Sequence, residues 1–309
     1  MNDVRNIKKD LQKNGFVKIS NFFTNDEIIE IKKSAATYNT KYGYNSGVCS
    51  LSTNLFDVFY KHSKLKTLLN EIIGKEVVFW GEATVNKTHS GGKTGIPEGY
   101  GVFHKDNTDR TDQDAPDWQT EFTIFRLGIY LDDYSNSSGG IGFRKYSHKK
   151  NKLKWLWNNR IFIRIVHLLD MVLKRSVYCR SKPGDLVIWY LTTDHAGNCK
   201  YLKFDKNIPS TKFTKSLLPK FLWSTTNTNE RITLFTTFGK KDNHLDRHFE
   251  LLLRRKYMID AWKKTEYSSD QLKDKQYPFD IIDMPKRVRD LQDNGELNNV
   301  CEDWVKIPY

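Results

Sequence analysis

His104 and Asp106, near the middle of the chain, have the types and spacing of a pair of metal ligands. In an extended segment residues i and i+2 point to the same side, so this imidazole and carboxylate can converge on one point. A second imidazole from a remote strand would complete a facial triad, which covers one face of a six-coordinate iron and leaves the other positions open. The alternative is a surface turn, because His-x-Asp is short and recurs by chance.

His195 is the candidate for the third ligand. It follows the turn Pro183-Gly184 and the apolar run 185–190, and it lies 91 residues beyond His104. A histidine at the end of such a strand is expected to point back toward the mouth of the sheet, whereas the alternative is a loop or cap histidine.

Arg231 opens the run Arg-Ile-Thr-Leu-Phe-Thr-Thr-Phe, in which Arg231 and Thr233 share one face of a strand. An arginine at an apparently buried position needs an anionic partner. A dicarboxylate cosubstrate would serve, with the guanidinium binding its distal carboxylate and Thr233 adding a hydroxyl contact. A protein carboxylate is the alternative partner.

Short strands separated by Gly and Pro turns must position these residues. This pattern indicates a mainly β protein with flanking helices, built on a β-barrel or jelly roll. No internal repeat and no low-complexity linker is present, so residues 1–309 are expected to form a single domain. The strands are predicted at residues 76–86, 121–131, 141–143, 185–190 and 231–238, and the helices at 28–36, 65–73 and 245–264.

Taken in order, these motifs resemble the iron(II)/2-oxoglutarate dioxygenases, specifically the phytanoyl-CoA dioxygenase-like family. The resemblance extends from about residue 10 to about residue 240. It includes the N-terminal segment 11–28, Phe103-His-Lys-Asp, Gly128-Ile-Tyr-Leu-Asp-Asp, Pro183-Gly-Asp-Leu-Val-Ile-Trp with His195, and Arg231-Ile-Thr. It implies a double-stranded β-helix, a jelly-roll core of the cupin type.

The resemblance also implies a role for each matching residue. His104, Asp106 and His195 would hold Fe(II) and form the catalytic centre, where O2 reacts. Arg231 would bind the cosubstrate 2-oxoglutarate with help from Thr233. Asn86 and Trp118 lie where the family often places cosubstrate or substrate contacts, and they are further cofactor-binding candidates. The retained Asp106 favours hydroxylation, desaturation or oxidative ring closure over halogenation, because halogenases of this superfamily replace that carboxylate with a small residue.

The chain departs from the family pattern in two places. Lys145-Tyr146-Ser147-His148 stands where Pro-Gly-Ser-His is usual, and the spacing from His195 to Arg231 is longer than usual. Two basic insertions are predicted, at about 149–180 and about 199–230. The first contains nine Lys or Arg and one Asp, with apolar residues at helical spacing from Ile161 onward. It could be a lid, a dimer contact, a membrane-surface helix or a peripheral helix packed on the barrel.

The composition of the chain is compatible with several kinds of binding partner. The formal net charge of +13 favours anionic partners, although plain solubility in a chain rich in Lys and Asn explains it equally well. No apolar run is long enough to span a bilayer, and the N-terminus lacks a secretory signal. Four scattered cysteines, at positions 49, 179, 199 and 301, indicate free thiols, so a cytoplasmic location is expected. His244 and His248, four apart on an expected helix, are a weak second candidate for a metal site.

The expected function is oxidation of a C–H bond in a small, anionic organic substrate, with release of succinate and CO2. Nucleic acid is not the expected partner. Two alternatives remain. One is a basic binding protein on a β-barrel scaffold that contacts nucleic acid or anionic lipid through residues 149–180. The other is an oxygenase whose substrate is a protein side chain or a carrier-bound group.

Overall fold

A computed structural model describes residues 4–42, 58–88, 103–109, 112, 114–136, 138–150, 160–225, 231–297 and 300. Cys49, Cys301 and most of the loop expected at 87–101 lie outside these residues. The helices are α1 (Val4–Asn14), α2 (Asn25–Tyr42), α4 (Ser63–Ile72), α5 (Arg160–Val172), α6 (Lys212–Leu217), α7 (Asn243–Leu252), α8 (Lys256–Lys263), α9 (Ser269–Lys273) and α10 (Met284–Asp293), with short 3-10 turns η1 (Pro116–Trp118) and η3 (Lys220–Leu222).

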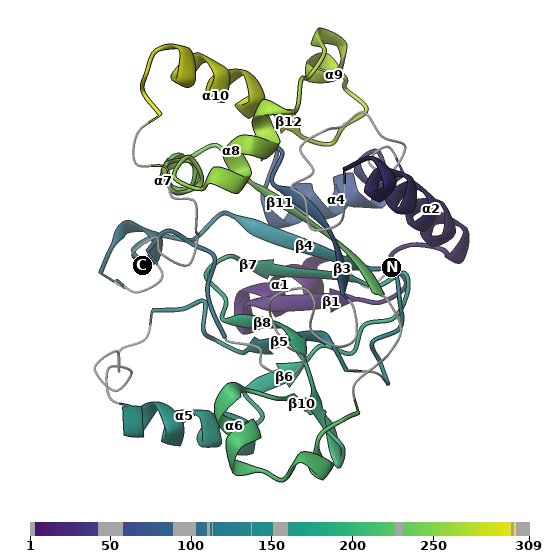
Figure 1. Ribbon diagram of the computed structural model, residues 1–309, viewed down its shortest axis with the longest axis vertical. Helices are drawn as coiled ribbons and strands as arrows, with labels where there is room; N and C mark the ends of the chain where they lie inside the picture. Colours follow the sequence, from purple (N-terminus) through teal and green to yellow (C-terminus); the bar gives the residue numbers. More distant parts are fainter. Residues whose placement is uncertain are drawn as a thin grey trace.

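The strands are β1 (Phe16–Ile19), β2 (Val77–Phe79), β3 (Ala83–Thr88), β4 (Phe125–Tyr130), β5 (Gly140–Arg144), β6 (Ser176–Tyr178), β7 (Leu186–Tyr190), β8 (His195–Cys199), β9 (Tyr201–Leu202), β10 (Asp205–Pro209), β11 (Arg231–Lys240) and β12 (Asp280–Ile281). The large sheet has the order β1-β7-β4-β11-β2-β12, with β3 also paired to β11. A smaller sheet has the order β6-β5-β8, and β9 and β10 form a hairpin (Figure 1).

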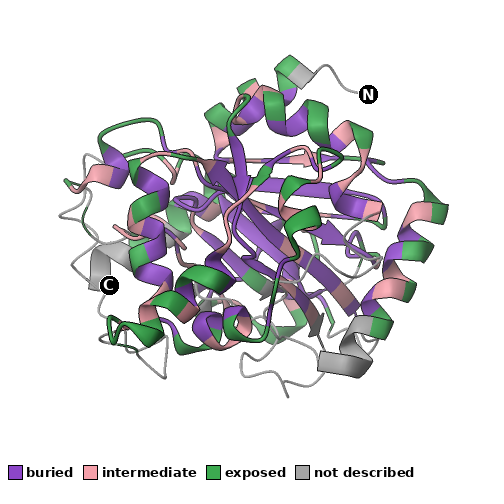
Figure 2. Ribbon diagram, turned by 90° about the horizontal axis from the view of Figure 1, so that it is seen from above, coloured by how far each residue is buried: buried purple, intermediate pink, exposed green. Residues whose placement is uncertain are grey.

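The two faces of the large sheet contribute to different hydrophobic clusters. On one face, Leu127, Ile188 and Leu234 belong to the main core, which also includes the apolar sides of α1, α2, α4 and α7. On the other face, Val187 and Trp189 cluster with residues of the smaller sheet. This alternation follows from the two-residue period of a strand. Figure 2 shows the buried strands crossing the centre, with helices exposed on their outer sides.

The mainly β architecture with flanking helices is confirmed, whereas the finer double-stranded β-helix arrangement stays a prediction, as does the single domain. The capping box at Thr24 and Glu27 opens α2, with Thr24 N donating to Glu27 Oε2 over 2.7 Å. None of the helices in the described ranges has the length and apolar character needed to cross a lipid bilayer.

One predicted strand is divided in the structure, and another ends where it was predicted but is followed by a turn. The strand expected at 76–86 is divided into β2 and β3 by Gly81, whose φ of 78° is in the left-handed region that favours glycine. The strand predicted at 185–190 is confirmed as β7, and the chain turns after it, so that His195 begins β8 instead of following directly on that strand. Both breaks position polar residues of the site described next.

Candidate metal and cosubstrate site

Two segments far apart in the sequence meet at the predicted metal ligands. The backbone N–H of His104 donates to His195 O over 3.0 Å, and that of His195 donates to His104 O over 2.9 Å. The N–H of Asp106 donates to Leu191 O over 2.9 Å. This pairing holds the short segment that begins at residue 103 against the start of β8, so the remote histidine reaches the His-x-Asp pair.

The three side chains converge. Each offers a ligand atom, and these atoms all lie within 4.8 Å of one another. Nε2 of His104 is 3.6 Å from Asp106 Oδ1, and Nε2 of His195 is 3.5 Å from Asp106 Oδ2. Within the residues that the structure describes, this is the one group of three or more His, Cys, Asp or Glu side chains arranged to hold a metal ion. Two imidazoles and one carboxylate fit the facial donor set of non-heme iron(II).

The orientation of the His195 ring is set by the residues that directly precede β8. Its Nδ1 lies 3.0 Å from the carbonyl oxygen of Thr193, to which an Nδ1–H can donate, leaving the Nε2 lone pair directed at the carboxylate. Burial lowers the pKa of His195 to about 4, with the carboxylate of Asp106 opposing that shift. The imidazole is therefore neutral near pH 7, as a metal ligand must be.

Asp106 is held by a buried charge network that begins on the large sheet. Arg126 Nη1 on β4 donates to Asp106 Oδ2 over 2.9 Å, and Arg126 Nη2 pairs with Glu82 Oε1. Glu82 also bonds His248 Nε2 at 2.9 Å and accepts the indole N–H of Trp80 over 3.1 Å. The network links α7 to the metal-ligand carboxylate through the break between β2 and β3.

These contacts keep both carboxylates ionised. Burial is the largest effect on Asp106 and would raise its pKa, but Arg126 and the two ligand histidines together hold that pKa well below its usual range. Burial likewise opposes ionisation of Glu82, and Arg126 and His248 lower its pKa to about 2. Sequence reasoning missed Arg126 and Glu82. Two features of the sequence could have revealed them: an Arg interrupts the otherwise apolar run 124–131, and a Glu lies between two strand segments.

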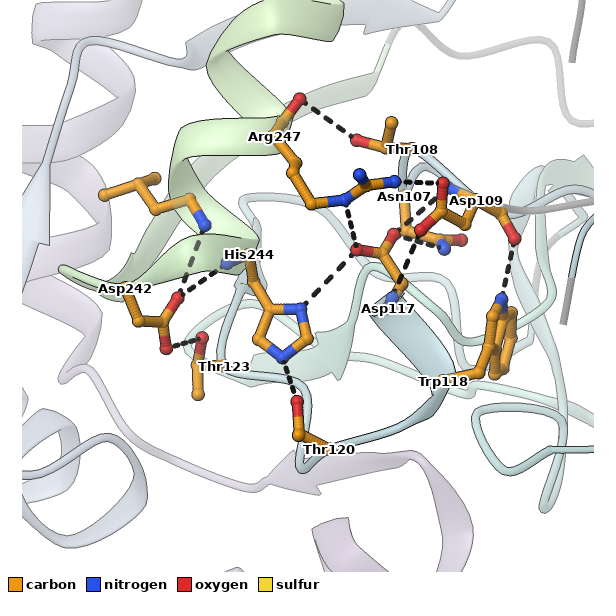
Figure 3. Close-up of polar contacts among 11 residues, drawn as sticks. Asn107, Thr108, Asp109, Asp117, Trp118, Thr120, Thr123, Asp242, His244 and Arg247 are labelled. Atoms are coloured by element: carbon orange, nitrogen blue, oxygen red, sulfur yellow. Dashed lines mark hydrogen bonds and ion pairs between the residues drawn. The ribbon is translucent and has the colours of Figure 1, made fainter. Parts of the chain in front are cut away.

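A second polar cluster holds the residues that directly follow Asp106 (Figure 3). The buried Asp117 accepts from Asn107 Nδ2 over 2.8 Å and from the N–H of Asp109 over 3.1 Å. Arg247 on α7 pairs with Asp109, and His244 Nδ1 lies 3.5 Å from Asp117 Oδ1. The cluster therefore fixes residues 107–109, directly after Asp106, to α7.

Trp118 belongs to this supporting cluster. Its indole N–H donates to Asp109 O over 2.6 Å, and the ammonium group of Lys105 lies 5.2 Å from its ring centroid. The structure thus places Trp118 against the ligand segment on the side of Lys105, and its cosubstrate contact stays a prediction. The weak metal candidates His244 and His248 do not share a site, since one bonds Thr120 at 2.8 Å and the other bonds Glu82 at 2.9 Å.

Arg231 lies at the start of β11 with 2% of its surface exposed. Its guanidinium carbon is 4.9 Å from the ring centroid of Tyr134. An added Cβ on Gly139 would collide with the guanidinium of Arg231, and the φ of 92° at this position also favours glycine, so the glycine leaves room for the guanidinium. Tyr134 Oη is 3.2 Å from Thr233 Oγ1, which joins the two predicted cosubstrate residues through one phenol.

The predicted cosubstrate residues and the predicted metal ligands share the face between the two sheets. Asn86 on β3 lies directly opposite Thr233 on β11. Phe235, two residues further on the same face, packs 5.9 Å from Trp189, whose ring lies 5.5 Å from that of His195. A continuous row of side chains therefore joins the Arg231 end of β11 to the metal-ligand group.

No family model and no curated protein matches this sequence. Among solved structures, the chain is similar to SnoK, a non-heme α-ketoglutarate-dependent carbocyclase from nogalamycin biosynthesis, with a TM-score of 0.50 and 12% identity over 80% of this chain and 91% of SnoK. It is also similar to HygX from Streptomyces hygroscopicus, solved with nickel and 2-oxoglutarate bound, with a TM-score of 0.50 and 11% identity over 77% of this chain and 87% of HygX.

These similarities establish the fold. The chain has the fold of these non-heme 2-oxoglutarate enzymes, as the family resemblance of the sequence implied. What the chain does with that fold must be argued from its own side chains.

Proposed function

We propose that this protein is an iron(II)- and 2-oxoglutarate-dependent oxygenase that oxidises a C–H bond of a small, anionic organic substrate. The observation that carries the proposal is the convergence of His104, Asp106 and His195, whose ligand atoms all lie within 4.8 Å of one another. Iron(II) bound there would supply oxygen activation coupled to the decarboxylation of 2-oxoglutarate to succinate and CO2. The comparison adds a precedent, since HygX holds nickel and 2-oxoglutarate on the same fold.

The protein's part in metal binding is to present a rigid donor set. His195 is neutral and its second nitrogen is engaged by a backbone carbonyl, so its Nε2 has one direction available. Asp106 is ionised and its Oδ2 is held by Arg126, which leaves Oδ1 for a metal. An iron held by these three residues would keep positions available for the oxo acid and for O2.

Arg231 is the proposed anchor for the distal carboxylate of 2-oxoglutarate. A buried guanidinium in a water-poor environment pairs strongly with a carboxylate and fixes its orientation. The hydroxyl groups of Thr233 and Tyr134, 3.2 Å apart, stand beside it as hydrogen-bond donors. Asn86 is well placed to add an amide contact because it lies opposite Thr233 on the neighbouring strand.

The substrate is proposed to approach from the side of His104. The side chain of His104 is 38% exposed, whereas that of His195 is 7% exposed, so the ligand group opens on the first side and is closed on the second. The net charge of +13 favours an anionic substrate. Because Asp106 retains the carboxylate, the outcome is hydroxylation, desaturation or ring closure. SnoK, described as a carbocyclase, shows that this fold supports ring closure.

The proposal is tested by titrating the metal-free protein with Fe(II) under anaerobic conditions, then measuring succinate formed from 2-oxoglutarate in air. Wild type is expected to bind one iron and to form succinate slowly even without substrate. Asp106→Ala is expected to lose both properties. Asp246→Ala, an exposed carboxylate on α7, is the matched control and is expected to retain them. Equal succinate formation by wild type and Asp106→Ala would overturn the proposal.

A further inference from the structure

The apolar stripe of helix α5 faces outward, whereas a helix that packs on a core normally buries this stripe. Ile165, Leu168, Leu169 and Val172, spaced i, i+3, i+4 and i+7, are 46%, 36%, 50% and 71% exposed. Asp170, on the opposite side, is 4% exposed. Surface helices of globular proteins normally bury the apolar stripe and expose the charged side. The reversed arrangement leaves an apolar face for something other than the core of this chain.

The reversed orientation is fixed by ion pairs. Asp170 Oδ2 lies 2.8 Å from Arg144 Nε of β5, and both side chains are buried. At the C-terminal end of the helix, Lys174 pairs with Asp205 of β10 at 3.3 Å, and Arg175 N donates to Asp170 O over 2.8 Å. The two ion pairs hold the helix against the smaller sheet and the hairpin, so rotating the stripe inward would bury it only by breaking them.

Further apolar side chains are exposed on the elements beside α5. Leu173, directly after the helix, is 54% exposed, and Leu217 on α6 is 49% exposed. Phe204 in the β9–β10 turn and Phe221 in η3 are each 71% exposed. These elements pack together through a small cluster that includes Leu202, Trp223 and Met171. In Figure 1, α5, α6 and β10 lie together at the lower end of the molecule, away from α7, α8 and α10.

We refer to these exposed residues of α5, α6, the β9–β10 turn and η3 as the α5–α6 surface. Its set is Ile165, Leu168, Leu169, Val172, Leu173, Phe204, Leu217 and Phe221.

The charge around the α5–α6 surface is basic. Residues 160–225 contain twelve Lys or Arg and four Asp. Each of the four Asp already forms an ion pair: with Arg144 for residues 170 and 194, with Lys18 for 185 and with Lys174 for 205. Lys203, Lys206 and Lys220 are exposed among the apolar residues. The charge offered to a partner by this end of the protein is therefore positive.

We propose that the α5–α6 surface docks on an anionic lipid bilayer, a function that goes beyond the oxygenase chemistry. A bilayer surface accepts both properties at once, because apolar side chains enter the headgroup–acyl boundary while lysines remain among anionic headgroups. Nucleic acid would use the positive charge but has no use for a stripe of Leu and Val. A second copy of the chain would bring the same positive charge against itself. Charge complementarity excludes a second copy, and the exposed apolar side chains favour a lipid bilayer over nucleic acid.

The test is co-sedimentation of the full chain with vesicles of phosphatidylcholine alone and of phosphatidylcholine with about one third phosphatidylserine. Binding is expected to be at least about tenfold tighter to the anionic vesicles and to weaken as salt is raised. Val172→Asn and Phe221→Asn are each expected to weaken it by about tenfold, because each removes an apolar side chain from the boundary. Ile29→Asn, which changes a 65% exposed residue on α2, is the matched control and should bind like wild type.

Charge reversal separates lipid docking from a general attraction of a basic protein. Lys203→Glu with Lys220→Glu is expected to abolish binding, whereas Lys33→Glu with Lys66→Glu, on exposed positions of α2 and α4, changes the net charge equally and is expected to preserve most of it. The proposal is overturned if both double variants lose vesicle binding equally, or if the wild type does not bind anionic vesicles. It is also overturned by light scattering that shows a dimer broken by Val172→Asn, since that result assigns the surface to a second copy. Binding to duplex DNA that is unaffected by Phe221→Asn also overturns it, because that result indicates that the basic residues bind nucleic acid.

Discussion

The charge network behind Asp106 predicts that Glu82 stabilises the protein in a pH-dependent way. Glu82→Gln keeps the size of the side chain and removes its charge. In the wild type, Glu82 is 5% exposed and contacts Arg126, His248 and the indole N–H of Trp80. The substitution therefore leaves Arg126 with Asp106 as its one carboxylate partner in the network.

The size of the effect follows from the pKa of Glu82, which falls from 4.5 to about 2 in the folded protein. A depression of this size corresponds to about 3 kcal/mol of stability. Because the folded-state pKa is depressed, this contribution is fully present above pH 4.5 and is lost as the pH falls toward 2. Such a loss is a large share of the roughly 5–15 kcal/mol that stabilises a domain.

The assay is urea unfolding of the metal-free protein, with chelator present, at a series of pH values from neutral to acidic. Glu82→Gln is expected to be about 3 kcal/mol less stable than wild type at neutral pH, and this difference is expected to shrink steadily below about pH 4.5. Glu76→Gln, at a 71% exposed carboxylate, is the control and should change stability by less than about 0.5 kcal/mol. A difference between Glu82→Gln and wild type that stays constant across the pH series refutes the reasoning.

Three further predictions concern the cosubstrate and the ligand segment. Gly139→Ala, whose Cβ would lie 2.1 Å from Arg231 Nη2 at a backbone φ of 92°, is expected to weaken 2-oxoglutarate binding at least about tenfold in calorimetric titration while iron affinity is retained. Tyr134→Phe removes only the hydroxyl and is expected to weaken 2-oxoglutarate binding about threefold, whereas Tyr134→Ala also removes the ring beneath the guanidinium and should cost at least about tenfold; equal effects would contradict the packing role. Asp117→Asn is expected to lower iron affinity by about tenfold through loosening of the bond to Asn107, and unchanged affinity would show that the cluster does not support the ligands.

The predicted residues of the site came from local patterns. His104 and Asp106 two apart, a histidine after an apolar strand and an arginine at the head of another are each visible in a short window. The structure brings the three metal-ligand candidates within 4.8 Å and puts Arg231 on the same face of the sheet as Thr233. The mainly β fold was predictable for the same reason, because strand periodicity and turn residues are local.

The supporting residues could not be predicted in this way. Glu82, Arg126 and His248 come from three separate elements, and only the register of β4 against β11 and the packing of α7 bring them together. Strand ends were also misplaced. The break at Gly81 depends on a left-handed backbone, which the apolar run around it conceals.

One departure from the family pattern has a physical explanation. Tyr146 stands where the family that the sequence resembles usually has glycine, and its φ of 65° is in the left-handed region that favours glycine. A non-glycine residue in this region costs about 1 kcal/mol. The turn is held by surrounding bonds, since Tyr146 N donates to Asn14 O over 3.1 Å and Ser147 Oγ donates to Arg144 O over 2.6 Å. The left-handed turn therefore forms at this position although glycine is absent.

The balance of charge in the buried centre connects the supporting network to the proposed chemistry. A metal ion binds neutral imidazoles, so the metal-bound ligand group would carry the single negative charge of Asp106, while Arg126 and Glu82 cancel each other. In the proposed complex, Fe(II) and doubly charged 2-oxoglutarate would leave one net negative charge, which the guanidinium of Arg231 is proposed to neutralise. A buried site is stable when its charges are paired in this way, and removing any one charged member leaves the others without compensation. For this reason Glu82, although it would touch neither metal nor cosubstrate, is expected to be needed to balance the charge of Arg126 beside the metal-ligand carboxylate.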